Sequence, residues 1–168
     1  MPESGRLRVL VVGLSWPPET FLVRLIRGLA AAGVDVLVSS SHQAGGAWPF
    51  EAGVTRVDAP SWSGPVPLRL GRLAVMGIRA VFRSGPEWRT LVGHGYRSGR
   101  FGERLRVWNR LLPYAGVSFD VVYFPWSSAA IDHMALFDLG RPAVISCRGS
   151  QIHVAPYDPQ RGRLRRPP

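Results

Sequence analysis

The sequence has one cysteine, Cys147, so it lacks the pair that an internal disulfide requires. No apolar run approaches the roughly 20 residues that cross a bilayer as a helix. The short apolar run at residues 7–13 leads into Trp16-Pro17-Pro18-Glu19, not into a small-residue cleavage site of the kind that ends a secretion signal. We therefore expect a cytoplasmic protein without disulfides.

Several motifs that carry chemistry are missing as well. The chain has no G-x-G-x-x-G and no G-x-x-x-x-G-K-[ST], so dinucleotide and P-loop sites lack their defining residues. Four histidines are scattered without a second ligand at metal spacing, which favours solvated or core histidines and predicts no metal cofactor. Cys147 ends an apolar strand and is interpreted as a small buried residue, not a nucleophile. No catalytic triad can be assembled, and we name no catalytic residue. The histidines are His42, His94, His133 and His153.

What the sequence does have is alternation between short apolar strands and amphipathic helices. Strand patterns occupy 7–13, 34–39, 54–57, 120–124 and 143–147. The helices expected between them occupy 20–32 and 127–139. Strands that alternate with helices form a parallel sheet with helices on both faces. The fold class predicted is therefore α/β, a Rossmann-like doubly wound sheet in a single domain over residues 1–160.

Residues 61–115 interrupt this alternation and carry most of the charge. All 21 basic residues are arginine, against 11 acidic residues, for a net charge of +10. Ten of the arginines, but only two glutamates, lie in 61–115. We expect a basic helical insertion there, with helices over 68–83 and 101–112 joined by a mobile glycine-rich linker at 93–99. The arginine-rich tail, 161–168, is expected to be disordered.

One face of the expected 68–83 helix is basic. At 100° per residue its four arginines fall on one side and its apolar residues on the other. Three interpretations stay open: a solvated amphipathic helix, a helix on an anionic membrane surface, or a nucleic-acid contact. The last lacks any accompanying nucleic-acid motif, so we expect no nucleic acid as partner. The four arginines are Arg69, Arg72, Arg79 and Arg83.

Two loops at expected strand ends could bind a ligand. The loop from Gly13 to Glu19 could hold a phosphate or sugar hydroxyl with its backbone N–H groups, or Gly13 could simply permit a tight turn. The segment Cys147-Arg148-Gly149-Ser150-Gln151 suits an anionic or polyol ligand, or Arg148 could pair with a surface acid such as Asp158. Carboxyl ends of parallel strands meet at one edge, so we expect both loops to border one cleft.

With these segments in place, the chain resembles the N-terminal half of a GT-B glycosyltransferase of the family 4-like group. The matching residues are 8–13 with 16–21, 28–36, 120–126 and 145–152. The resemblance implies transfer of a sugar from a nucleotide-diphosphate sugar to a sugar, lipid or polyol acceptor, with retention and without a metal. It also implies that this half shapes the acceptor site, while a second domain holds the donor.

The resemblance places specific residues in the substrate cleft. Gly13 and Ser15 match the family's glycine loop. Arg148, Gly149, Ser150 and Gln151 match the loop after the fifth strand, where Arg148 and Ser150 would bind acceptor hydroxyls or donor phosphate. Basic, apolar helices of this domain often dock on membranes in the family, which assigns that role to the four arginines of 68–83 and suggests a peripheral location on the inner membrane face.

The chain also departs from the family pattern. The E-x7-E motif and basic donor-phosphate residues of the second half have no match, and Pro125-Trp126 stand where the family has a histidine. We therefore expect a truncated or frame-shifted product, or one half of a split enzyme, that is weak or inactive alone. A separate C-terminal half is the partner expected of a split enzyme. The alternative is a non-catalytic Rossmann-like module that binds a membrane or another protein.

Overall fold

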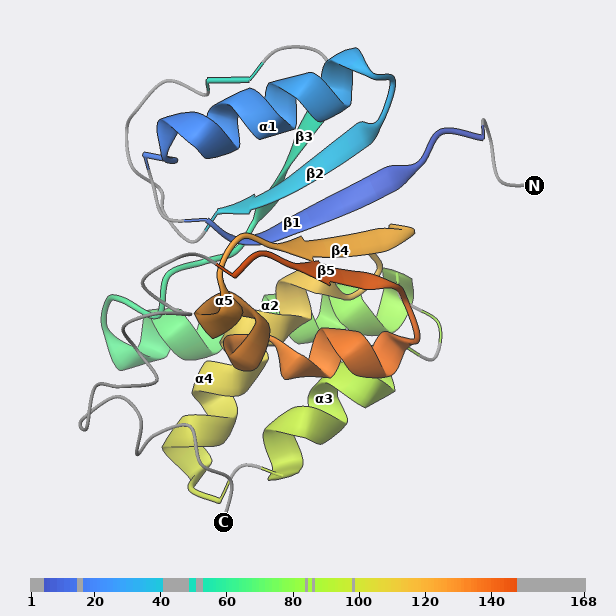
Figure 1. The fold of residues 1–168 in the computed structure, drawn as a ribbon. Coiled ribbons are helices and arrows are strands. Elements are labelled where there is room, and N and C mark those ends of the chain that lie inside the picture. The colour runs from blue at the N-terminus through green and yellow to red at the C-terminus, as the bar shows by residue number, and fades with distance from the viewer. Residues whose placement is uncertain are drawn as a thin grey trace, which may run out of the picture.

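The computed structural model describes residues 5–14, 17–40, 49–50, 53–83, 85, 87–97 and 99–147. Five parallel strands form one sheet in the order β3-β2-β1-β4-β5, with β1 at its centre. The fold is α/β and consistent with a Rossmann-like arrangement, as the sequence predicted (Figure 1). The strands are β1 Arg8–Leu14, β2 Asp35–Ser40, β3 Val54–Asp58, β4 Val121–Phe124 and β5 Ala143–Ile145.

Helices cover both faces of this sheet (Figure 1). One face carries α1 (Thr20–Ala31), and the other carries the group that follows β3 together with the segments after β4. This second group comprises α2 (Val66–Arg83), α3 (Glu87–Arg97), α4 (Phe101–Leu111), the short 3-10 turn η1 (Leu112–Tyr114), α5 (Ser127–Asp132) and the 3-10 segment η2 (Met134–Leu139).

Side chains alternate between the two faces of the sheet along β1, and this alternation divides the core into two layers. Val9 and Val11 pack on the α1 side with Ile26, whereas Leu10 and Val12 pack on the other side against the larger helical layer. All of these side chains except Val9, which is 6% exposed, are fully removed from solvent. Burying such a side chain contributes about 1.5–3 kcal/mol, so β1 anchors both halves of the core.

The middle segment is helical, but its expected linker is wrong. Residues 93–97, predicted to be part of a mobile connection, belong to α3. Gly95 faces α4, and a Cβ atom there would collide with the indole ring of Trp108. The glycine therefore permits close helix packing, where the sequence pattern had indicated flexibility. Helix α2 forms an outer layer: Leu73 and Ala80 pack with Leu112 in a small core cluster of their own.

The single helix expected over 127–139 is also wrong, because it divides at His133. That residue has φ −122° and ψ 31°, which ends α5 and starts η2. Its backbone N–H is shared between the carbonyls of Ala129 and Ala130, at 3.1 and 3.2 Å. The kink turns the imidazole inward. Gly140, at φ +68°, then ends η2 before β5.

None of the helices in the described part of the chain has the length and apolar character needed to span a membrane.

Candidate functional site

A cleft of about 480 Å³ opens at the carboxyl ends of the central strands. Its floor comes from the ends of β1 and β2, and the segment after β3 forms one side. Helices α4 and α5 with η1 form the rest of the wall. A crevice at this edge is where open parallel sheets bind ligands. The lining includes Gly13, Leu14, Ser39, Ala59, Pro60, Ser61, Trp62, Arg106, Asn109, Arg110, Tyr114, Trp126, Ser128, Ala129, Asp132 and His133.

Gly13 is the one predicted substrate-binding residue that the structure describes, and it lines this cleft. Its φ of +83° lies in the left-handed region, and a Cβ atom would collide with the side chain of Ala129. The glycine thus lets α5, in the wall of the cleft, pack closely against β1, which forms its floor. The other predicted binding residues, Ser15, Arg148, Gly149, Ser150 and Gln151, lie outside the described residues.

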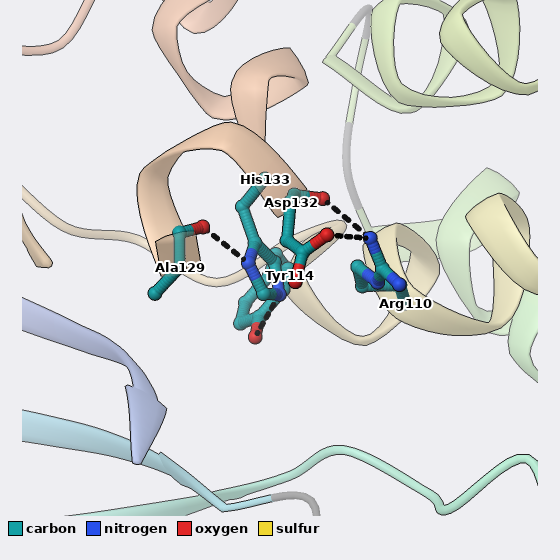
Figure 2. A network of polar contacts seen from close by, with 5 residues as sticks. All are labelled: Arg110, Tyr114, Ala129, Asp132 and His133. Carbon is teal, nitrogen blue, oxygen red and sulfur yellow. Dashed lines mark hydrogen bonds and ion pairs between the residues drawn. The ribbon is translucent and has the colours of Figure 1, made fainter. Parts of the chain in front are cut away.

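A buried chain of polar groups forms the deepest part of the cleft. Ser39 Oγ on β2 lies 2.8 Å from the Tyr114 hydroxyl, which lies 3.5 Å from His133 Nε2. His133 Nδ1 lies 2.8 Å from the carbonyl oxygen of Ala129 (Figure 2). These polar contacts connect the sheet, through η1, with the end of α5.

The hydrogen-bond partners determine which atoms carry protons. A carbonyl oxygen can only accept, so His133 Nδ1 carries the hydrogen and donates to Ala129. In the neutral ring Nε2 is then an acceptor, and the Tyr114 hydroxyl donates to it. Tyr114 in turn accepts a hydrogen bond from the Ser39 hydroxyl. The hydrogen bonds therefore run in one direction: Ser39 donates to Tyr114, and Tyr114 donates to His133.

Burial keeps both ring systems uncharged. It raises the pKa of Tyr114 to about 12, against smaller opposing effects from the Ser39 hydrogen bond and the Arg110 charge. Burial also lowers the pKa of His133 below its usual 6.5, partly offset by the hydrogen bond to Ala129. At neutral pH the back of the cleft is thus polar but without charge.

Charge is found nearer the opening. An Arg110 guanidinium nitrogen lies 2.8 Å from Asp132 Oδ1 and donates to the Asp132 carbonyl oxygen at 3.0 Å (Figure 2). Both side chains are about half exposed, so the ion pair contributes at most about 1 kcal/mol to the stability of the fold. Its main effect is to hold the two side chains in place. Arg106, one turn earlier on α4, forms no ion pair with any residue that the structure describes. Among the described lining residues, Arg106, Arg110 and Asp132 give the opening a net positive charge.

Sequence reasoning missed most of these lining residues. His133 was interpreted as a solvated or core histidine. The sequence around it does not indicate that Ser39 and Tyr114 are its hydrogen-bonding neighbours in the cleft. Asn109 was missed too, since it stands between Trp108 and Arg110 on a helix with four charged residues. It is buried, and its side-chain amide donates to the Pro60 carbonyl at 2.8 Å, fixing the loop after β3.

Cys147 differs from the expectation for it. Cys147 was expected to be buried, which is wrong: β5 ends at Ile145, on the edge of the sheet, and Cys147 is exposed. No group of three or more His, Cys, Asp or Glu side chains that could hold a metal ion occurs within the described ranges.

The four arginines of α2 do not share one environment. Arg79 and Arg83 are exposed, and Arg72 is half-buried. Arg69 is half-buried too, with its guanidinium 5.0 Å from the ring centre of Trp62 and its Nε enclosed. Arg69 therefore lies on the side of α2 that faces Trp62, a residue of the cleft lining.

Comparison of the chain with protein-family models, with curated proteins and with solved structures found no match. The glycosyltransferase resemblance therefore rests on the sequence pattern alone.

Proposed function

We propose that this chain is the acceptor-side domain of a metal-independent, retaining glycosyltransferase. The observation that carries the proposal is the polar cleft at the carboxyl edge of the sheet, beside Gly13. The sheet order, in which consecutive strands run outward from β1 on both sides, is the arrangement in which ligands bind at that edge. The sequence resemblance supplies the reaction, and the cleft supplies a place for one of its substrates.

The chemistry of the lining suits an acceptor rich in hydroxyl groups. Asp132 can accept hydrogen bonds, Arg110 can donate them, and Ser128 can do both. The uncharged Tyr114 and His133 close the back of the cleft without attracting an ion. A second domain would hold the nucleotide-diphosphate sugar, and catalysis would rest on positioning and on stabilising the charge of the departing diphosphate.

The proposal retains the roles expected for the loop after β5. In a parallel sheet β5 ends at the same edge as β1, with β4 between them. Arg148 and Ser150 follow β5 by a few residues and are proposed to contact acceptor hydroxyls or donor phosphate. Ser15 follows β1 and is proposed to contact the same ligand.

A binding experiment tests the acceptor site. Saturation-transfer NMR would be run with glycerol, myo-inositol and common monosaccharides on the parent chain and on Ser128→Tyr, which fills the opening of the cleft. The control Ser118→Tyr is exposed and lines none of the described cavities. We expect at least one polyol to give transfer to the parent and to the control but not to Ser128→Tyr. Transfer that is absent throughout, or equal in all three, would contradict the proposal.

A second function is favoured by the outward face of α2, and we propose it as docking on an anionic membrane. Val75, Ile78 and Phe82 lie on this face, and Phe82 is 85% exposed. Arg79 and Arg83 lie beside them and carry the charge that attracts acidic head groups. Apolar insertion flanked by arginine is the usual chemistry of an interfacial helix. The same face would serve the non-catalytic membrane-binding module that is the alternative to the enzyme.

Vesicle sedimentation tests this docking. We expect the parent chain to bind vesicles that contain phosphatidylglycerol more strongly than vesicles of phosphatidylcholine alone. Phe82→Gln and the pair Arg79→Gln/Arg83→Gln should each weaken that binding. Leu25→Gln, an exposed leucine on α1 across the sheet, is the matched control. Equal binding to both vesicle types, or no loss in the α2 variants, would remove the docking proposal.

A further inference from the structure

Three hollows follow one another along the helical side of the molecule. The polar cleft shares Trp62 and Arg106 with a smaller hollow of about 210 Å³. That hollow shares Leu70 and Leu105 with a third one, of about 340 Å³, between α2, α3 and α4. A ligand could therefore extend from the sheet edge to the outer helices without leaving a lined surface.

The middle hollow is cationic. Arg69 and Arg106 both line it, and no carboxylate does among the described residues. Arg69 stacks on Trp62, and its buried Nε has no hydrogen-bond partner in the described structure. A buried donor of a charged group without an acceptor is unfavourable, and an anion in the hollow would relieve this. Phosphate oxygens match guanidinium donors in charge and geometry.

The third hollow is mainly apolar, with Tyr96 as the hydroxyl-bearing residue of its lining. Leu73, Trp88 and Trp108 are typical of its lining, and no charged side chain contributes to it. The Trp108 indole N–H is already used, since it donates to the Val92 carbonyl at 3.0 Å. A peptide placed here would leave most of its backbone polar groups without partners, whereas a hydrocarbon chain has none to satisfy.

We propose that the three hollows bind one phosphate-bearing amphiphile. Its polar head lies in the cleft, its phosphate lies between Arg69 and Arg106, and its alkyl chain lies in the apolar hollow. Charge complementarity supports an anionic occupant, because the helices that form the last two hollows belong to the segment with ten arginines and two glutamates. This inference rests on the proposed function. If the cleft is the acceptor site, the acceptor is a lipid phosphate and not a free sugar.

The proposed site of the alkyl chain is tested with a substitution that fills the apolar hollow. Gly77 on α2 lines the apolar hollow, and a Cβ atom there would meet nothing within 4 Å. Gly77→Leu should therefore place its side chain in the hollow, with no collision at Cβ. Gly28→Leu is the matched control, because Gly28 is an exposed helical glycine on α1 with equally open surroundings. Circular dichroism of both variants checks that they fold.

Isothermal titration with monomeric alkyl phosphates gives the readout. We expect the parent and Gly28→Leu to bind dodecyl phosphate at least about tenfold more tightly than hexyl phosphate, since each buried methylene adds to affinity. Gly77→Leu should lose that chain-length preference. Equal affinity for both chain lengths in the parent, or an unchanged preference in Gly77→Leu, would overturn the inference.

The phosphate is tested separately with dodecyl maltoside, which has the same chain and no charge. The parent should prefer dodecyl phosphate, and Arg69→Gln/Arg106→Gln should reduce the preference at least about tenfold, through loss of charge-assisted hydrogen bonds. Arg106→Gln alone, at an exposed position, should show a smaller loss in the same direction and serves if the double variant does not fold. An unchanged preference in both would overturn the inference.

Failure of this inference differs from failure of the proposed function. If polyols bind in a manner that Ser128→Tyr abolishes but dodecyl phosphate does not bind, the acceptor site stands and the lipid inference is overturned. If dodecyl phosphate binds as described but no polyol does, the lipid site stands and the hydroxyl-acceptor proposal is overturned.

Discussion

The hydroxyl of Tyr114 lies 2.8 Å from Ser39 Oγ, which joins η1 to the carboxyl end of β2 at the back of the cleft. Both residues are almost fully buried, and Tyr114 belongs to the main core cluster. The hydrogen bond therefore does two things: it closes the cleft with an uncharged polar wall, and it ties the helical layer to the sheet.

Tyr114→Phe tests how much this hydrogen bond stabilises the fold. The change leaves the Ser39 hydroxyl and His133 Nε2 buried without their partner, so the free energy of unfolding should fall by about 1–3 kcal/mol. Urea unfolding measures it. Tyr123→Phe is the matched control, because the Tyr123 hydroxyl lies 2.8 Å from Ser146 Oγ near the sheet edge and is only partly buried. Equal losses in the two variants would contradict the special role of Tyr114.

The lowered pKa of His133 predicts a pH-dependent stability. The unfolded chain titrates near 6.5 and the folded chain at lower pH, so between these values the unfolded state binds more protons. The free energy of unfolding should thus be highest above pH 6.5 and fall as the pH drops through that window. In His133→Asn, which keeps a donor toward Ala129, the loss between pH 7.5 and 5.5 should be smaller. The same loss in both proteins would argue against a buried neutral imidazole.

Gly13→Ala should be costly for two separate reasons. The positive φ disfavours any side chain, and the new methyl group would collide with Ala129. Together these should destabilise the fold by about 2–4 kcal/mol and widen the contact between β1 and α5. Gly33→Ala isolates the first effect, since Gly33 also has φ +82° but open surroundings, and should lose only about 1 kcal/mol. Thermal unfolding would compare them, and similar losses would show that close approach at Gly13 is unimportant.

Sugar transfer by the 168 residues alone should be slow or absent. The E-x7-E motif and the basic donor-phosphate residues expected of a second domain have no match in this sequence. A radiolabelled-sugar transfer assay with common nucleotide sugars and polyol acceptors measures this. Steady turnover with an ordinary rate constant would show that the donor is bound without such a domain.

The sheet was largely predictable, and the reason lies in its pattern. Apolar runs such as 7–13 and 120–124 are short, rich in β-branched residues and ended by glycine or proline, which favours strands. Their alternation with helices favours a parallel sheet. The errors came where tertiary contacts outweigh local signals. Gly95 looked like a linker residue because its partner Trp108 is thirteen residues away, and His133 breaks a helix whose sequence shows no breaker. Ser39 and Tyr114 are 75 residues apart, so their hydrogen bond depends on the complete topology.

The most direct measurement of the acceptor site is a chemical-shift map. The ¹⁵N-labelled chain would be titrated with the polyol that gives the strongest saturation transfer, and backbone amide shifts would be followed. Binding in the cleft predicts the largest shifts at Gly13, Ser39 and Asn109, together with little change along α1. Largest shifts on α1, or none at saturating ligand, would contradict the claim that this edge of the sheet binds the acceptor.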